Sequence, residues 1–117
     1  MKEAVIVSAA RSPIGRAFRG AFNNLQSPSM SSHAIVAAVA RAGVDPAEID
    51  DCIMGAAMQQ GTQSSNLGRQ AAMASGLPVT VSGMTVDRQC SSGLMAISIG
   101  ANNITNDGSS VVVAGGC

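Results

Sequence analysis

The stretch that decides the fold is VDRQCSSGLMAISIGANNIT, residues Val86–Thr105. Between Arg88 and Asp107 the sequence contains no Lys, Arg, Asp or Glu. Its apolar residues recur at helical spacing, and small residues occupy much of the remaining surface. The apolar stripe consists of Leu94, Ile97, Ala101 and Ile104. We therefore expect a helix directly after Cys90 that is covered by protein on nearly every side.

On both sides of this helix, β-rich runs alternate with helical patterns. We expect strands over residues 4–10, 52–58, 79–89 and 109–116, and helices over residues 31–43 and within 65–78. Asp45 is expected to cap a short helical turn. Strands that are apolar along their whole length and alternate with helices indicate an α/β fold, with helices covering both faces of the sheet. The strand at residues 4–10 is expected to be buried.

The longest irregular segment runs from Ser12 to Ser29. Its length exceeds ordinary connections, which favours a functional or interface loop. Arg11, Arg16 and Arg19 lie in or beside it. Solvated arginines are the favoured interpretation, and an anion-binding role is the alternative.

The amino-acid composition indicates which classes of partner to expect and whether the chain can form a complete protein by itself. Of the 117 residues, 46% are hydrophobic and 12% are charged, so little of the chain is suited to face water. We expect the chain to be part of a larger protein. Seven basic and seven acidic residues cancel, and Phe18 and Phe22 are the only aromatic residues. Nucleic acid and membrane are therefore not expected partners.

Three widely spaced cysteines and one histidine predict neither a disulfide framework nor a metal site. No secretory signal is recognised, and we expect a reduced, cytoplasmic protein. Cys52 lies within an expected strand and is interpreted as a small core residue. His33 is interpreted as a capping or packing residue, and Cys117 receives no function.

Cys90 is the candidate catalytic residue. The first turn of a helix carries unpaired N–H groups and a partial positive charge, which favour a thiolate over a thiol. The same N–H groups, including that of Cys90, are candidate donors to an oxyanion, and Gly93 allows a substrate to approach closely. Free cysteines are also common core residues, so position alone leaves both an inert thiol and a nucleophile open.

Three segments resemble the N-terminal half of thiolases in order and spacing, most closely the acetyl-CoA acyltransferase (3-ketoacyl-CoA thiolase) type. They are VIVSAARSPIGRAFRGAF, GVDPAEIDDCIMGAAMQQGTQSSNLGRQAA and VDRQCSSGLMAI. The resemblance implies a thiolase-like α/β fold, the N-terminal half of a five-layered α-β-α-β-α architecture. It also implies that residues 1–117 form an incomplete N-terminal domain, without the loop region and the C-terminal domain. The thiolase nucleophile maps onto Cys90.

The resemblance further implies an acyltransferase that cleaves 3-ketoacyl-CoA by thiolysis, or condenses acyl-CoA with acetyl-CoA in reverse, through an acyl-cysteine intermediate. Coenzyme A is the expected co-substrate, with no permanently bound cofactor and no metal. A homodimer or homotetramer is expected, with residues 82–89 at the interface. The family's acid/base residues do not map onto this chain, and the isolated chain is expected to be inactive. Alternatives are a biosynthetic acetoacetyl-CoA thiolase, a ketosynthase-like condensing enzyme, and a non-catalytic acyl-CoA-binding module.

Overall fold

A sheet of three parallel strands forms the centre of the structure, a computed structural model in which residues 2–117 are described. The middle strand is β1 (Ile49–Gly55), flanked by β2 (Ser82–Val86) and β3 (Val111–Gly116). In the register, Cys52 lies opposite Gly83 on one side and Val113 on the other. The strand order β2-β1-β3 leaves the outer edges of β2 and β3 without a partner strand in the described part of the chain.

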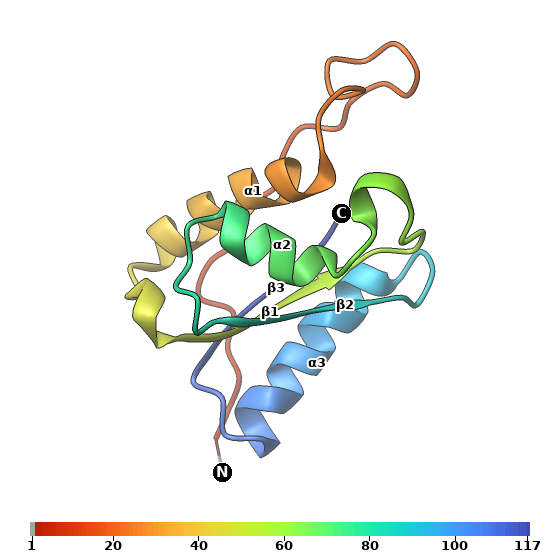
Figure 1. The fold of residues 1–117 in the computed structure, drawn as a ribbon. Helices are drawn as coiled ribbons and strands as arrows, with labels where there is room; N and C mark the ends of the chain where they lie inside the picture. Colours follow the sequence, from red (N-terminus) through yellow and green to blue (C-terminus); the bar gives the residue numbers. More distant parts are fainter. Residues whose placement is uncertain (1) are drawn as a thin grey trace.

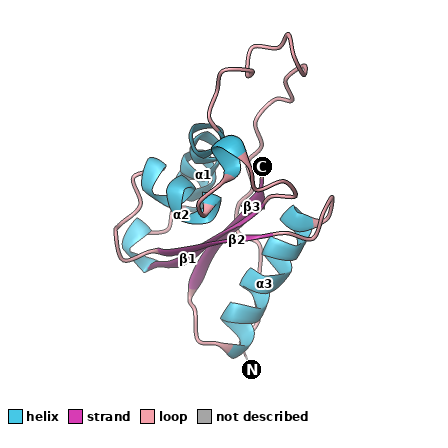
Figure 2. Ribbon diagram, turned by 45° about the vertical axis from the view of Figure 1, so that its right-hand side comes forward, coloured by secondary structure: helices cyan, strands magenta, loops and turns pink. Residues whose placement is uncertain are grey.

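Helices cover both faces of this sheet. Helices α1 (Ser27–Ala42) and α2 (Leu67–Ala74) lie on one face, and α3 (Ser92–Asn106) lies on the other (Figures 1 and 2). Two short 3-10 turns, η1 (Pro46–Glu48) and η2 (Gly61–Gln63), precede β1 and α2. The expected α/β fold with helices on both faces is confirmed.

The main core lies between the sheet and the pair α1–α2. Successive side chains of a strand point to opposite faces, so Cys52 and Met54 face this pair while Ile53 points toward α3. Ile53 is fully buried, as is Ala96 of α3. Burying a side chain of this size stabilises the fold by about 1.5–3 kcal/mol. The other buried members of the main core are Ile35, Ile49, Ala56, Leu67, Ala71, Ala72, Leu77 and Val81.

The predicted helix signals are mostly confirmed. Gly43 ends α1 in the left-handed conformation with φ 67°, and Asp45 caps η1 by accepting a hydrogen bond from Ala47 N at 2.9 Å. However, α1 begins at Ser27 rather than at residue 31. Proline fits the first helical turn because its missing N–H is not needed there, so Pro28 starts a helix where we expected a loop. Ile35 of α1 is 5% exposed and belongs to the core, whereas the adjacent Val36 is 51% exposed.

Strand boundaries differ from the prediction by about three residues. The first predicted internal strand, residues 52–58, is β1 at Ile49–Gly55, because η1 ends at Glu48 and extended backbone follows at once. Likewise, residues 79–81 belong to a turn in which Val81 N donates to Pro78 O, and β2 starts only at Ser82.

The prediction of a buried strand at residues 4–10 is wrong. These residues form no strand, and Val5, Ile6 and Val7 are 66–78% exposed. The segment is attached through side chains, with Lys2 Nζ donating to Ser109 O and Arg41 to Ala9 O. A β-rich sequence becomes a strand only where a neighbour accepts its ladder hydrogen bonds. No described strand does so here.

Within this chain the sheet covers one side of α3, and the described residues do not provide the expected cover on its other sides. The residues of α3 that are buried are the small ones, Ser92, Ala96 and Gly100. They let the helix approach the sheet closely: a Cβ at Gly100 would lie 3.0 Å from Val112 Cγ1. In the expected stripe, Leu94 is 71% exposed and Ile97 is 40% exposed, while Ile104 is half-buried.

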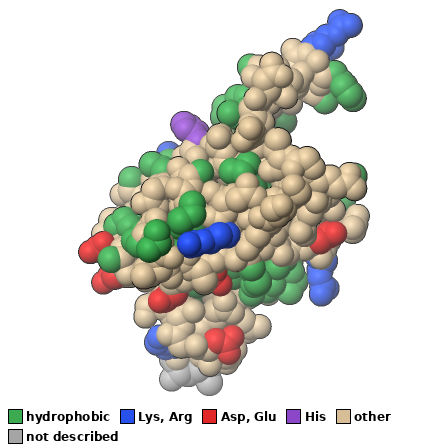
Figure 3. Space-filling model, in the orientation of Figure 1, with side chains coloured by type: hydrophobic (Ala, Val, Ile, Leu, Met, Phe, Trp, Pro, Cys, Tyr) green, Lys and Arg blue, Asp and Glu red, His purple; other side chains and the backbone are tan. Residues whose placement is uncertain are grey.

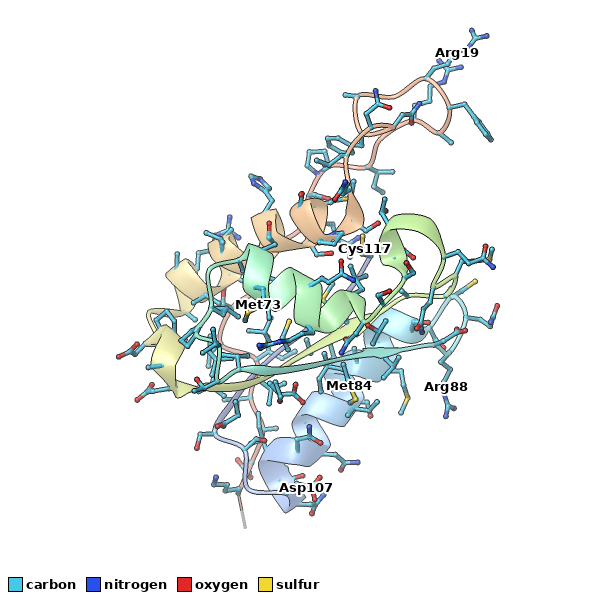
Figure 4. The ribbon with its side chains drawn as sticks, in the orientation of Figure 1. Arg19, Met73, Met84, Arg88, Asp107 and Cys117 are labelled. Atoms are coloured by element: carbon cyan, nitrogen blue, oxygen red, sulfur yellow. The ribbon has the colours of Figure 1, made fainter. Side chains whose placement is uncertain are left out.

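The segment before α1 projects from the body as a long loop, with Arg19 near its tip (Figures 3 and 4). Ile14 is 90% exposed and Phe18 is 96% exposed. The arginines of this loop face solvent, in agreement with the favoured interpretation. The accessible surface totals 7182 Å², whereas a compact protein of this mass exposes about 5900 Å². The chain therefore exposes more surface than a compact protein of its mass, and Ile14, Phe18 and Leu94 are among its exposed large hydrophobic side chains.

Candidate active site

Cys90 lies in the turn between β2 and α3, at the carboxyl end of the sheet. Ligand sites of open parallel sheets lie at this end of the strands. The Cys90 side chain is exposed, one residue before the helix N-cap Ser91. Figure 4 shows Arg88, of the same turn, and Asp107 near opposite ends of α3. The uncharged stretch between them is thus one helix, with the thiol at its start.

Hydrogen bonds within the turn fix its shape. Asp87 Oδ1 accepts from Gln89 N at 2.8 Å, and Ser92 Oγ accepts from Arg88 N at 2.8 Å. The hydroxyl of Ser92 donates to Gln89 O at 2.6 Å, and that of Ser91 donates to Arg88 O at 2.8 Å. Side chains of the turn therefore form hydrogen bonds with several N–H and C=O groups of its own backbone.

Glycines bring the start of α3 directly onto the ends of two strands. A Cβ at Gly55, the last residue of β1, would lie 2.2 Å from the carbonyl carbon of Ser92. A Cβ at Gly116, the last residue of β3, would lie 2.9 Å from Gly93 Cα. Real Cβ atoms do not come this close, so only glycine permits the observed position of the helix start.

The other side of the turn is anchored through β2 and the start of α2. Asn66 caps α2 by accepting from Arg69 N at 3.1 Å, and its amide donates to Gly83 O at 2.9 Å. Thr85 Oγ1 accepts from Gly68 N at 3.0 Å. These hydrogen bonds join α2 to β2, the strand that leads into the Cys90 turn.

The electrostatics of the turn favour an anion beside the sulfur. In the described part of the chain, no hydrogen bond uses the backbone N–H of Cys90 as donor. That N–H lies beside the first turn of α3, where the partial positive charge of the helix dipole is concentrated. A developing oxyanion that accepts a hydrogen bond from this N–H would be stabilised there.

The remaining cysteines and the histidine lie in other surroundings. Cys52 is fully buried in β1, as expected of a core residue. Burial, together with the nearby charge of Asp51, raises the pKa of the Cys52 thiol to about 12. His33 is exposed on α1, across the sheet from α3. Cys117 is exposed, and its N–H donates to Gly55 O at 3.0 Å.

The described residues hold neither a metal-ligand cluster nor a membrane-length helix. Among residues 2–117, no three or more His, Cys, Asp or Glu side chains are grouped to hold a metal ion. None of the helices in that range is both long and apolar enough to cross a bilayer.

Sequence reasoning proposed Cys90 as the candidate catalytic residue but did not name the residues that hold its turn. Gly55 and Gly116 lie at the carboxyl ends of their strands. A glycine in a strand often marks a place where another backbone segment approaches closely, so the sequence could have indicated these two residues. Asn66 precedes a helical pattern, as capping residues do. Nothing in the sequence indicated that Ser92 faces inward toward the turn rather than toward solvent.

Comparison with known proteins identifies the fold family. The family model described as thiolase, N-terminal domain, matches residues 4–117. The chain belongs to the thiolase family. The thiolase resemblance seen in the sequence is thus confirmed, and the site described above lies within the matched thiolase domain.

Curated thiolase relatives match almost the whole chain. An acetyl-CoA acetyltransferase of Cupriavidus necator is 41% identical over 99% of the chain and 29% of its own length. A 3-ketoacyl-CoA thiolase of Bacillus subtilis is 39% identical over 99% of the chain and 30% of its own length. The crystal structure of the Bacillus anthracis acetyl-CoA acetyltransferase superimposes with a TM-score of 0.92 at 46% identity, covering 99% of this chain and 29% of that one. The chain therefore spans less than a third of the length of these relatives.

Limited alkylation should distinguish the three cysteines. We expect a limiting amount of iodoacetamide at pH 8 to label Cys90 first, because its thiol is exposed at a helix start. Cys52 should remain unlabelled in the folded protein, since its thiol is buried and its pKa is raised to about 12. Peptide mass spectrometry after short incubations measures the order. Faster labelling of Cys117 or Cys52 would contradict the activation of Cys90.

Proposed function

We propose that the protein containing this chain is an acyl-CoA acyltransferase that cleaves 3-ketoacyl-CoA by thiolysis, with Cys90 as the nucleophile. The observation that carries the proposal is the exposed thiol at the start of α3, within a domain that matches the thiolase family from residue 4 to 117. A cysteine with only a packing role would be buried, as Cys52 is.

The proposed reaction has two steps. The Cys90 thiolate attacks the keto carbon of the substrate, and the bond between that carbon and the α-carbon breaks. Its electron pair goes to the α-carbon, which takes up a proton as acetyl-CoA leaves. The acyl group stays on Cys90 as a thioester. The thiol of a second CoA then attacks this thioester, loses its proton and releases acyl-CoA, which regenerates the Cys90 thiolate.

The described residues account for nucleophile activation in this scheme. The first turn of a helix favours a thiolate, and the backbone N–H of Cys90 is suited to donate a hydrogen bond to the negatively charged oxygen that develops when the thioester is attacked. Coenzyme A enters as co-substrate, and the scheme needs no permanently bound cofactor. Proton transfer to the α-carbon requires an acid/base group, and His33 is too remote on α1 to supply it. We assign that role to residues outside this chain.

The test is acyl-enzyme formation on Cys90. Intact-mass measurement of the protein containing this chain, incubated with acetyl-CoA, should show an added acetyl group, and peptide mapping should place it on Cys90. Thiolysis of a series of 3-ketoacyl-CoA substrates then reports chain-length preference. Ligand binding without acylation would instead support a non-catalytic acyl-CoA-binding module.

A second candidate function is biosynthetic condensation of two acetyl-CoA molecules. It is favoured by the names of the Cupriavidus necator relative and of the Bacillus anthracis structure, both acetyl-CoA acetyltransferases. The same Cys90 thioester serves both directions. A preference for acetoacetyl-CoA over longer substrates would favour this candidate.

We also predict that the protein is a homodimer or a dimer of dimers. β2 is an edge strand, and edge strands with unpaired backbone groups are usually covered or paired with another strand. Pairing of residues 82–89 with the same segment of a second copy gives a closed two-fold interface. Light scattering at micromolar concentration should report at least twice the mass of one chain. A monomeric mass would contradict the prediction.

A further inference from the structure

The hydroxyl of Ser92 is the most buried polar contact of the Cys90 turn. Ser92 is the first residue of α3 and is only 4% exposed. Its Oγ accepts from Arg88 N at 2.8 Å and donates to Gln89 O at 2.6 Å. One hydroxyl thus binds both residues that lead into Cys90.

The backbone conformation of Gln89 makes these hydrogen bonds necessary. Gln89 has φ 49°, in the left-handed region that non-glycine residues rarely adopt. Such a conformation is disfavoured for residues with a Cβ. The φ and ψ angles of Gln89 set the direction in which the chain enters Cys90. If Gln89 returned to a more favourable conformation, the sulfur would move away from the start of α3.

Ser92 is in turn held by the central strand. Its backbone packs against Gly55 so closely that a Cβ there would lie 2.2 Å from the Ser92 carbonyl carbon. This contact fixes the Ser92 backbone against β1, so the hydroxyl projects toward the turn from a fixed position. Asp87 supports the same arrangement from the other side, since its Oδ1 accepts from Gln89 N.

We propose that Ser92 is a positioning residue for Cys90. Its hydroxyl holds Arg88 and Gln89 in the strained turn and so keeps Cys90 in its exposed position at the start of α3. This inference rests on the proposed function, in which Cys90 is the nucleophile. Ser92 does not take part in bond formation.

The neighbouring serine provides a matched control. Ser91 Oγ also donates to a turn carbonyl, Arg88 O, at 2.8 Å. However, Ser91 is exposed, and its own backbone N–H donates to the same carbonyl at 3.2 Å. If the Ser91 hydroxyl is removed, Arg88 O still accepts a hydrogen bond from Ser91 N. The hydrogen bond from Ser92 Oγ to Gln89 O also remains, so the conformation of Gln89 should not change.

The experiment compares Ser92→Ala with Ser91→Ala in the protein containing this chain. For Ser92→Ala we expect acylation of Cys90 by acetyl-CoA to slow by about 10-fold or more, because small misplacements of a reacting atom are costly. KM should change little, since no substrate contact is removed. The rate of Cys90 alkylation by iodoacetamide, measured at one fixed pH, should fall because the thiol is displaced from its position at the start of α3. Ser91→Ala should stay within about twofold of the parent protein in all three measurements.

Two results would overturn the proposal. One is equal behaviour of the two alanine variants in Cys90 acylation and alkylation. The other concerns Ser92→Thr, which keeps the hydroxyl and should acylate within about threefold of the parent. A 10-fold loss in this folded threonine variant would refute the role of the hydroxyl, and the comparison decides the matter even if Ser92→Ala fails to fold. If the parent protein forms no acyl-enzyme, the proposed function fails, while the alkylation rate still tests Ser92.

Discussion

Replacing Cys90 with serine is expected to lower acyl transfer by the protein containing this chain about 10³-fold or more. A serine hydroxyl stays protonated near neutral pH and is a far weaker nucleophile than a thiolate. The proposed thioester intermediate would not form. Steady-state thiolysis of acetoacetyl-CoA and the acetyl mass shift together measure the loss.

The control for this experiment is Cys117→Ser. Cys117 is also exposed, and its contacts with Gly55 and Gln63 are made by backbone atoms, which the substitution leaves in place. We expect near-parental activity from this variant. Equal losses in Cys90→Ser and Cys117→Ser would argue that general disturbance of the sheet end, rather than loss of the nucleophile, explains the effect.

Replacing Gly55 with alanine is expected to have the largest effect on stability. The added methyl group would lie 2.2 Å from the carbonyl carbon of Ser92 and 2.4 Å from Gly93 N. These are backbone atoms in the first turn of α3, so the strain cannot be relieved by a side-chain rotation. We expect a loss of about 3 kcal/mol or more in the free energy of unfolding. Displacement of the helix start should also slow Cys90 alkylation.

Gly115 provides the matched control for Gly55. It lies on the adjacent strand β3, opposite Met54, and a Cβ there would meet only Met54 Sδ at 3.9 Å, an ordinary contact. Gly115→Ala should change the urea midpoint of unfolding far less than Gly55→Ala. Comparable midpoints for the two variants would show that α3 can move away from β1 at little cost, against the close packing described here.

The sequence alone was sufficient for the parts of the fold that depend on local chemistry. Gly43 ends α1 because a residue without a Cβ adopts the left-handed conformation freely, and Asp45 caps η1 through its own side chain. The alternation of β-rich and helical runs predicted the α/β layers. The uncharged run between Arg88 and Asp107 predicted a helix with Cys90 at its start, and α3 spans Ser92–Asn106.

The errors arose where a residue's environment depends on segments far away in the sequence. Residues 4–10 have the composition of a buried strand, but strand formation needs a neighbouring backbone, and no described strand pairs with them. Both sides of α3, the stripe of larger apolar residues and the side with small residues, were expected to be covered, and the sequence did not indicate which of them meets the sheet. The structure places Ala96 and Gly100 against the sheet, because small residues allow close contact with it.

The candidate site divides in the same way. The sequence by itself determined the chemical type of the site, a thiol at the N-terminus of an uncharged helix, because hydrophobic periodicity and helix dipoles follow from local sequence. Only the tertiary structure decided how that thiol is held: Gly55 and Gly116 admit the helix start onto two strands, and Ser92 turns its hydroxyl inward to the strained Gln89. The physical reason is that steric exclusion and buried hydrogen bonds act between residues that only the folded sheet brings together.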